Sequence, residues 1–299
     1  MDMLRIAGLQ KQFGEKEVLK GVDLVVPEKS IFGFIGKNGA GKTTTMKAVL
    51  GLLKADAGEI LVGGEPVQYG QTATNRLIGY LPDVPEFYSF MTPMEYLIFC
   101  GEIVGMEKTD IKRRSGELLE LVGLADERHR VKGFSRGMKQ RLGIAQALLG
   151  RPKLLICDEP TSALDPVGRK EILDILLAVR EQTTVLFSTH ILSDVERICT
   201  DIAFLHEGTV HMQGKLSEVK SQYRSEEYYL GIEKEAEKQQ LLQAFPAMMI
   251  RPDGGAVFRE SDYRLHEVLG YLAEKELALS RVERLEPTLE SLFMEVVEK

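Results

Sequence analysis

The stretch that decides the fold is Gly36-Lys37-Asn38-Gly39-Ala40-Gly41-Lys42-Thr43, which fits the phosphate-loop pattern G-x-x-x-x-G-K-[ST] at every fixed position. It follows the apolar run Ile31–Ile35 and leads into a helical pattern from Lys42 through Leu50. A strand, a glycine loop and a helix in this order form the context that a phosphate loop requires, because loop N–H groups and the helix N-terminus bind phosphate together. The stretch therefore predicts binding of a nucleoside triphosphate.

A second stretch, Leu154-Leu155-Ile156-Cys157-Asp158-Glu159, is an apolar run that ends in two carboxylates. Ligands of open α/β sheets bind at the carboxyl ends of the strands, so we expect Asp158 to hold Mg²⁺ there, together with the Thr43 hydroxyl. Glu159 would polarise or deprotonate an attacking water, and Lys42 would contact the β- and γ-phosphates. An acidic strand end that faces solvent is the alternative, and the phosphate loop favours the first interpretation. The two stretches together predict magnesium-dependent phosphoryl transfer.

Composition limits the class of protein. The chain has 299 residues, enough for one large domain or two modest ones, and 44% hydrophobic with 28% charged residues is typical of a globular protein. A net charge of -7 argues against broad electrostatic attraction to nucleic acid. No apolar run approaches the roughly 18 residues of a membrane span, and the start lacks the pattern of a signal peptide. The three cysteines form no C-x-x-C pair, which suits a reducing cytosol. We therefore expect a cytoplasmic protein.

The order of predicted elements indicates the domains. Strands and helices alternate on both sides of three predicted helices at residues 92–105, 111–122 and 137–149, which implies an α/β core with a mostly parallel sheet and a helical insertion. We expect this core, a phosphate-loop NTPase fold, to span residues 1–216, with its helical subdomain at about 84–150. Residues 217–299 read as a small α+β accessory domain whose β-α-β-β-α-β order matches the ferredoxin-like pattern.

Further motifs around these stretches resemble those of the ATP-binding cassette (ABC) ATPases. Residues 134–141 look like the signature motif of that family, and 158–166 look like its Walker B segment followed by the D-loop. Ser188-Thr189-His190 looks like its switch histidine segment, and Phe13 stands where its adenine-stacking aromatic occurs. Together with the phosphate loop, these make five motifs in the family's order, so the resemblance is highly specific.

The resemblance implies roles for particular residues. The catalytic set would be Glu159, His190 and Lys42, with the His190 imidazole contacting the γ-phosphate and organising the attacking water. The residues that bind ATP would be Phe13, Gly36, Lys37, Asn38, Gly39, Ala40, Gly41, Lys42, Thr43, Thr44, Ser135 and Gly137. Ser135 and Gly137 would contact the γ-phosphate held by a partner subunit, although they could simply cap the helix that follows. Phe13 could instead be a core residue, although an aromatic here suits stacking.

Two residues depart from the family pattern. Asp83 stands where the family usually has a glutamine near the magnesium ion. We place it in the metal set beside Thr43 and Asp158, but aspartate is shorter than glutamine and charged, which puts that role in doubt. Arg136 stands in the signature where glycine is common. Both changes could lower turnover, but neither removes a catalytic residue.

The resemblance also implies partners. The chain has one phosphate loop and one signature, which in this family meet only across two subunits, so a second ATPase subunit is expected, either another copy or a paralogue. Membrane-spanning transporter subunits would dock near the aromatic-rich segment 85–92, whose rings could alternatively bury the base of the helical insertion. The chain would then lie peripherally on the inner face of the cell membrane.

Residues 285–293 resemble the tail of the ABC-2-type bacterial export ATPases, which favours an exporter. A soluble ABC ATPase acting on ribosomes or nucleic acid is the alternative, and the acidic charge and the lack of an internal repeat count against it. An unrelated phosphate-loop enzyme such as a small-molecule kinase would leave 134–141 and His190 unexplained. We expect ATP and Mg²⁺ as cofactors and no nucleic-acid partner.

Overall fold

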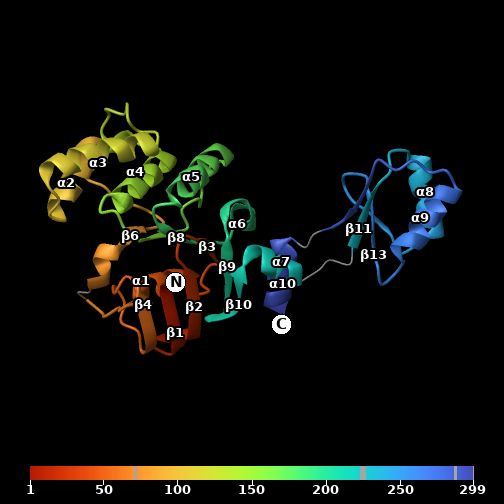
Figure 1. Ribbon diagram of the computed structural model, residues 1–299, viewed down its shortest axis with the longest axis horizontal. Helices are drawn as coiled ribbons and strands as arrows, with labels where there is room; N and C mark the ends of the chain where they lie inside the picture. Colours follow the sequence, from red (N-terminus) through yellow and green to blue (C-terminus); the bar gives the residue numbers. More distant parts are fainter. Residues whose placement is uncertain (71–72, 223–226, 286–287, 299) are drawn as a thin grey trace. The chain divides into compact units, whose positions relative to one another are not determined.

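A computed structural model describes residues 1–70, 73–222, 227–285 and 288–298. Its centre is a six-stranded sheet in the order β10-β9-β3-β8-β7-β6 (Figure 1). The strands are β3 (Ile31–Ile35), β6 (Ile78–Leu81), β7 (Leu154–Asp158), β8 (Thr184–Thr189), β9 (Asp201–His206) and β10 (Thr209–Lys215). All are parallel except β10, which is antiparallel to β9. The expected mostly parallel sheet is confirmed.

Every residue of β3, β7 and β8 is buried, as expected for strands covered on both faces. Because these strands are parallel neighbours, their carboxyl ends lie at one edge of the sheet. That edge carries the phosphate loop after β3, the acidic pair at the end of β7 and His190 after β8. The topology therefore brings three distant sequence segments together.

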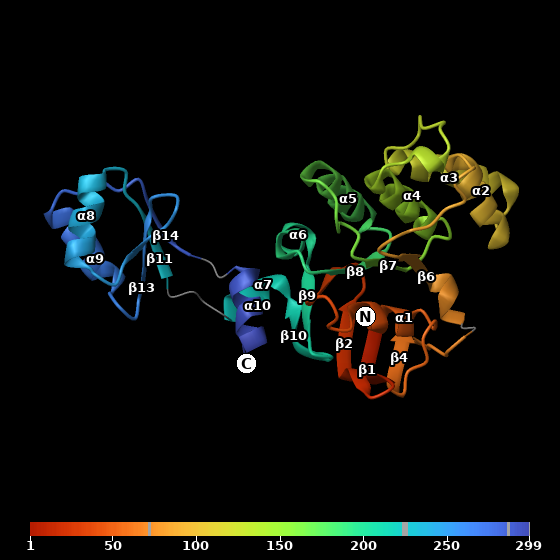
Figure 2. The ribbon, with the colours of Figure 1, turned by 180° about the vertical axis from the view of Figure 1, so that it is seen from behind.

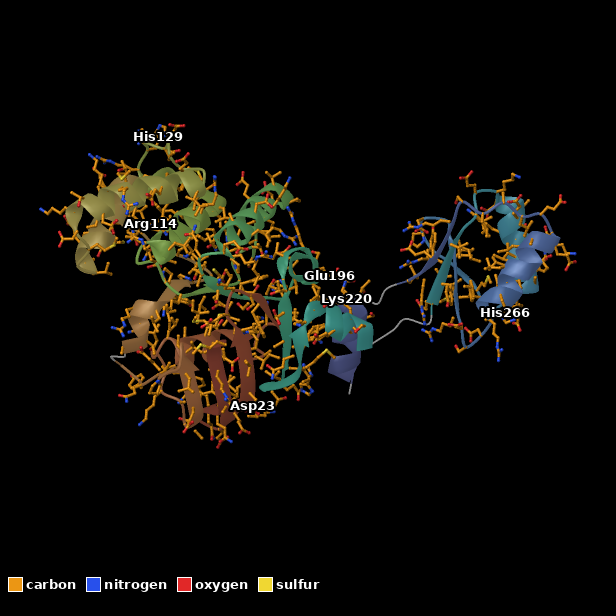
Figure 3. The ribbon with its side chains drawn as sticks, viewed as in Figure 1. Asp23, Arg114, His129, Glu196, Lys220 and His266 are labelled. Carbon is orange, nitrogen blue, oxygen red and sulfur yellow. The ribbon has the colours of Figure 1, made fainter. Side chains whose placement is uncertain are left out.

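A second, antiparallel sheet covers one side of the core. Its order is β2-β1-β4-β5, and its strands are β1 (Asp2–Phe13), β2 (Lys16–Pro27), β4 (Ala57–Val62) and β5 (Glu65–Pro66). Side chains of both sheets and of helix α1 (Lys42–Val49) share one hydrophobic core. In β2 the Asp23 carboxylate accepts a hydrogen bond from the Gly8 N–H at 2.8 Å, beside an irregular register in β1 (Figure 3). This sheet holds α1, and with it the phosphate loop, against the parallel sheet.

Helices α5 (Pro166–Val179) and α6 (Leu192–Ile198) lie on the opposite side of the parallel sheet from α1 (Figures 1 and 2). The packing is close at Gly33, where an added Cβ would lie 2.9 Å from Cys199 Sγ. The short helix α7 (Leu216–Gln222) follows β10. Neither β10 nor α7 was expected from the sequence.

The helical insertion is present between β6 and β7. It contains α2 (Pro93–Ile103), α3 (Lys108–Leu121) and α4 (Arg136–Leu148), with a 3₁₀ turn at Val131–Gly133. Another 3₁₀ turn, Ala73–Leu77, precedes β6. A capping box starts α2, because Thr92 accepts from the Glu95 N–H and Glu95 accepts from the Thr92 N–H. Arg114 of α3 donates to the Leu148 carbonyl at 3.3 Å and so joins α3 to α4 (Figure 3).

The C-terminal region contains a separate antiparallel sheet in the order β12-β13-β11-β14. Its elements are β11 (Glu227–Gly231), α8 (Glu235–Ala244), β12 (Met249–Ile250), β13 (Ala256–Arg259), α9 (Leu265–Glu274) and β14 (Arg281–Arg284). This β-α-β-β-α-β order and strand arrangement confirm the predicted ferredoxin-like pattern. The last strand begins at Arg281, whereas the sequence predicted it from Leu277.

Contacts divide the chain into two compact units, Met1–Ser217 with Phe293–Lys299, and Glu218–Leu292. The closing helix α10 (Leu289–Glu298) therefore does not belong wholly to the C-terminal unit. The reason is a ring contact between Phe293 and Phe204 of β9, with centroids 5.6 Å apart. The division at residues 216 and 217 and the subdomain bounds 84–150 stay predictions. Glu286 and Pro287 of the closing tail lie outside the described residues.

Among the described residues, no helix combines the length and the apolar character needed to cross a membrane.

Candidate nucleotide-binding site

The phosphate loop leaves β3 and curls into α1. Gly39 and Gly41 have φ angles of 85° and 113°, which side chains with a Cβ rarely adopt. Gly36 is required for a different reason: there is no room for a side chain, because an added Cβ would lie 2.6 Å from the backbone oxygen of Leu205. The Gly36 N–H also donates to the Thr189 carbonyl at 3.3 Å, which ties the loop to the end of β8. Backbone torsions, close packing and this hydrogen bond thus fix the shape of the loop.

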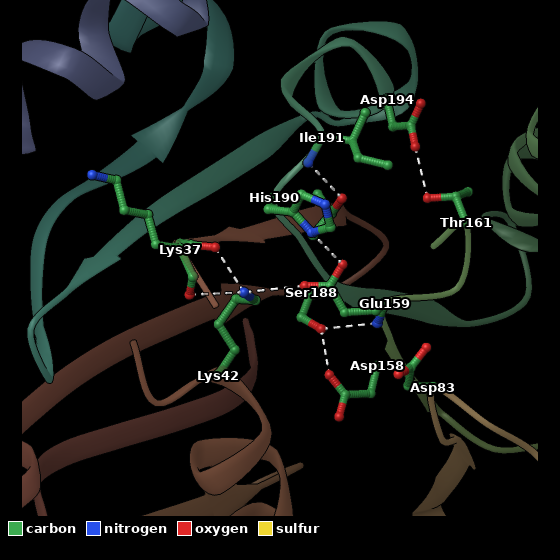
Figure 4. A network of polar contacts seen from close by, with 12 residues as sticks. Lys37, Lys42, Asp83, Asp158, Glu159, Thr161, Ser188, His190, Ile191 and Asp194 are labelled. Carbon is green, nitrogen blue, oxygen red and sulfur yellow. Dashed lines mark hydrogen bonds and ion pairs between the residues drawn. The ribbon is translucent and has the colours of Figure 1, made fainter. Parts of the chain in front are cut away.

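Lys42, the first residue of α1, is buried within this loop. Its ammonium donates to the carbonyls of Gly36 and Lys37 at 2.7 and 3.2 Å. It also lies 3.1 Å from Glu159 Oε1, and the two side chains are only 5% and 13% exposed (Figure 4). The cation is therefore held at the mouth of the loop by groups that a phosphate could replace.

Glu159 is held in an unusual backbone conformation. Its φ is 48°, the left-handed region, which costs a residue with a side chain about 1–2 kcal/mol. Such strain is found mainly at functional sites. The carboxylate Oε2 lies 2.9 Å from His190 Nδ1, so the carboxylate bridges Lys42 and the imidazole (Figure 4). The three predicted catalytic residues are thus in direct contact.

Asp158 makes a second network beside the first. Its Oδ2 accepts from the Thr43 hydroxyl at 2.8 Å, and its Oδ1 accepts from the Ser188 hydroxyl at 2.6 Å. The Ser188 oxygen in turn accepts from the Glu159 N–H at 3.0 Å. Ser188 was not predicted as a site residue, although its register opposite Asp158 in the parallel sheet could have indicated it.

The donor set suits Mg²⁺ bound together with phosphate. A hydroxyl and a carboxylate converge at Thr43 and Asp158, and Glu159 Oε1 is buried with the Lys42 ammonium 3.1 Å away. Hard oxygen ligands of this kind, few in number and supplemented by substrate phosphates, are typical of magnesium sites. The residues present therefore fit the ion.

Two side chains near Asp158, Tyr80 of β6 and Cys157 of β7, have raised pKa values. Burial, and then the charges of Asp158 and other nearby acids, raises the pKa of Tyr80 to about 12. Burial also raises the pKa of the Cys157 thiol, which precedes Asp158. Neither group adds a negative charge beside the carboxylates at neutral pH.

These residues surround a pocket of about 330 Å³ at the carboxyl edge of the sheet. The predicted residues that line it are Asn38, Gly39, Gly41, Lys42, Thr43, Thr44, Asp83, Asp158, Glu159 and His190. Val18 and Ser162 line it as well and were not predicted. Lys37 contributes its carbonyl to Lys42, and buried Ala40 donates its N–H to the Lys37 carbonyl at 3.1 Å. Most of the phosphate-loop set is therefore assembled in one place.

Besides Gly36, Lys37 and Ala40 of the loop itself, three predicted residues outside the loop do not line this pocket. Phe13 ends β1 with its ring 49% exposed, so it is not a core residue. Ser135 caps α4 by accepting from the Met138 N–H at 3.2 Å, and Gly137 has open space around it, with Leu164 Cδ2 at 3.9 Å from an added Cβ. The signature segment thus contributes no side chain to the described lining of this pocket.

The D-loop after Glu159 is fixed by a buried carboxylate. Asp194 of α6 accepts from the Thr161 hydroxyl at 2.7 Å (Figure 4). It also accepts from Arg169 Nη2 at 2.6 Å. Asp165 caps α5 by accepting from the Gly168 N–H at 2.8 Å. These contacts join the segment that follows Glu159 to the helix that follows His190.

Comparison with known proteins gives matches over nearly the whole chain. The family described as "ABC transporter" matches residues 19–162, and the family "ATP-binding protein DrrA1-3-like, C-terminal domain" matches 214–297. The uncharacterized ABC transporter ATP-binding protein YxlF of Bacillus subtilis is 40% identical over 99% of both chains. The bacitracin transport ATP-binding protein BcrA of Bacillus licheniformis is 41% identical over 69% of this chain and 67% of its own.

A solved structure shares the fold of most of the chain. It is CbiO1 from Clostridium perfringens, part of the ABC transporter complex CbiONQ, with a TM-score of 0.67 and 26% identity. The match covers 82% of this chain and 96% of that one.

Proposed function

The chain belongs to the ATP-binding proteins of ABC transporters, and we propose that it is the magnesium-dependent, ATP-hydrolysing subunit of an exporter. The observation that carries the proposal is the contact of Glu159 with both Lys42 and His190 beside the phosphate loop. Binding alone needs only the loop, whereas a carboxylate held between a cation and an imidazole is suited to activating water.

The chain's own groups define the steps. Phosphate oxygens take the place of Glu159 and the loop carbonyls around the Lys42 ammonium, which frees the Glu159 carboxylate to accept a proton from water. His190 keeps that carboxylate oriented through its Nδ1. Mg²⁺ at Thr43 and Asp158 would neutralise phosphate charge. Phe13, exposed at the end of β1, would stack on the adenine.

We further propose that two ATPase subunits assemble around the nucleotide. Ser135 and Gly137 lie outside the pocket lining of their own chain, which supports a role on a nucleotide bound by another subunit. A twofold arrangement of two copies, or of one copy and a paralogue, would place each signature on the facing phosphate loop.

The partner of this dimer would be a pair of membrane-spanning subunits. In the segment 85–92, Phe87 packs edge-on against buried Tyr96 with centroids 5.0 Å apart, so part of the segment anchors the helical insertion. Tyr88 and Phe90 remain 51% and 61% exposed. An exposed aromatic pair on an anchored segment supports docking of a protein partner. The chain would then work in the cytoplasm, on the inner face of the membrane.

Export is favoured over import by the resemblance of residues 285–293 to the tail of the ABC-2-type export ATPases. BcrA is named for bacitracin transport, and the C-terminal region matches a family of DrrA-like ATP-binding proteins. The relatives reported above are transporter proteins, which also favours this function over a soluble ABC ATPase acting on ribosomes or nucleic acid.

Substitution Glu159→Gln tests the proposal. The variant should bind ATP with Mg²⁺ but hydrolyse it at least about 100-fold more slowly, because the amide cannot accept the proton. Glu181→Gln, a change at a solvent-exposed carboxylate, should keep wild-type turnover and serves as the control. Turnover of Glu159→Gln at the wild-type rate would contradict the assignment.

A further inference from the structure

The two residues that depart from the family pattern form an ion pair with each other. Arg136 Nη2 lies 3.0 Å from Asp83 Oδ1, although the residues are far apart in sequence. Arg136 is the first residue of α4, the signature helix, and Asp83 belongs to the segment that follows β6. The pair therefore links the signature to the rim of the nucleotide pocket within one subunit.

Asp83 is fixed on α4 by its backbone as well. Its carbonyl accepts a hydrogen bond from Nε2 of fully buried Gln140 at 2.6 Å. The preceding segment packs tightly on the same helix, because an added Cβ at Gly143 would lie 2.5 Å from Leu81 Cδ1. Replacing the Asp83 side chain should therefore leave this segment in place.

The same Asp83 lines the nucleotide pocket together with Asp158 and Glu159 (Figure 4). Three carboxylates around one phosphate site repel the ligand unless cations compensate them. Lys42 compensates Glu159, and Arg136 compensates Asp83. Asp83 thus stands between the chain's own nucleotide site and its own signature.

Arg136 needs an anion where it stands. The N-terminus of a helix carries the positive end of the helix dipole, which disfavours a cation. Lys132, Lys139 and Glu86 line the same neighbouring pocket of about 550 Å³ as Arg136 and Asp83, so cations outnumber carboxylates there. Asp83 supplies the counter-charge, but the two side chains are 46% and 42% exposed, so the pair is weak and open to exchange.

We propose that Asp83 is a positioning residue that holds Arg136 in the nucleotide-free subunit and yields it to the γ-phosphate of ATP on the facing subunit. This inference rests on the proposed function, in which the signature meets a partner's nucleotide. An arginine can bind a phosphate through two parallel N–H···O bonds, whereas the contact of Arg136 with the exposed Asp83 carboxylate is made through Nη2. ADP lacks the γ-phosphate, so after hydrolysis Arg136 returns to Asp83. The ion pair therefore increases the difference in stability between the ATP-bound and the ADP-bound dimer.

The test is a double-mutant cycle on ATP-driven dimerisation. All proteins carry Glu159→Gln to prevent turnover, and the dimer dissociation constant is measured by analytical ultracentrifugation at saturating Mg-ATP. Asp83→Asn should tighten the dimer by about twofold to fivefold, the range for an exposed ion pair. Arg136→Gln should weaken it, and Asp83→Asn should have no effect in the Arg136→Gln background. The coupling should shrink as salt rises, because the charges are exposed.

Matched controls separate this role from a general charge effect. Glu65→Gln removes the carboxylate of another exposed ion pair, with Arg76, and should leave the dimer unchanged. If Asp83 acted only by repelling ATP in its own pocket, the effect of Asp83→Asn would persist without Arg136, and that result would overturn the proposal.

The outcomes also separate this inference from the proposed function. A Glu159→Gln protein that binds ATP but does not dimerise would contradict the proposed assembly, and the role of Asp83 with it. Dimerisation with purely additive effects of the two substitutions would overturn the role of Asp83 alone.

Discussion

Lys42→Met should destabilise the nucleotide-free protein, and Glu159→Gln should relieve part of that loss. The Lys42 ammonium contacts two carbonyls and one carboxylate while 5% exposed, and Glu159 is 13% exposed. Removing one member of a buried ion pair costs about 3–5 kcal/mol, because the other charge stays buried. His190 still contacts Oε2 of Glu159, so we expect the lower end, about 3 kcal/mol.

The double variant, Lys42→Met with Glu159→Gln, tests whether the two stability losses are coupled. Glu159→Gln alone should cost about 1 kcal/mol, since Lys42 keeps its two carbonyl acceptors. With both changes no charge is stranded, so the combined loss should fall short of the sum by about 2 kcal/mol. Lys42→Met should also abolish ATP binding in both backgrounds, because the phosphate loses its cation.

Hydrogen-exchange mass spectrometry over a urea series is the assay, because it reports the stability of each compact unit by peptide. Peptides from β3, β7 and β8 should show the loss, while peptides from 227–285 serve as an internal reference. A Lys42→Met protein as stable as wild type, or strictly additive losses, would refute the reasoning.

Three further predictions follow from local geometry. Gly36→Ala should lower ATP affinity at least about tenfold in calorimetry, because its Cβ would push the loop off the Leu205 carbonyl; unchanged affinity would contradict the packing argument. Phe90→Asp should abolish co-purification with membrane subunits, whereas Leu52→Asp, at a similarly exposed position, should not; equal recovery would exclude the docking role. Cys157 should resist iodoacetamide at pH 8 until unfolding, since a raised pKa lowers its thiolate fraction; fast labelling of the native protein, read by mass spectrometry, would show otherwise.

Local sequence patterns predicted much of the core. The apolar runs at β3, β7 and β8 lead directly into the phosphate loop, the acidic pair and His190. Parallel pairing brings the carboxyl ends of these strands together. The three helices of the insertion were predicted as well, and in the structure Thr92 caps the first of them. In these segments the local signal and the tertiary environment agree.

Other features depend on contacts that a pattern does not contain. Strand β10 is a polar edge strand whose residues are partly or fully exposed, so no apolar alternation marks it. Ser188 acts through its register opposite Asp158, and the Asp83–Arg136 pair depends on how the β6 segment packs on α4. The end of α10 joins the first unit through Phe204, which lies in a distant strand.

The central claim is that this chain drives a membrane transporter. We would purify the tagged chain from its native membranes in mild detergent and identify the co-purifying proteins by mass spectrometry. The account predicts a polytopic membrane protein, recovered together with a second ATPase subunit. Recovery of ribosomal or nucleic-acid-binding proteins, with no polytopic membrane protein, would contradict it.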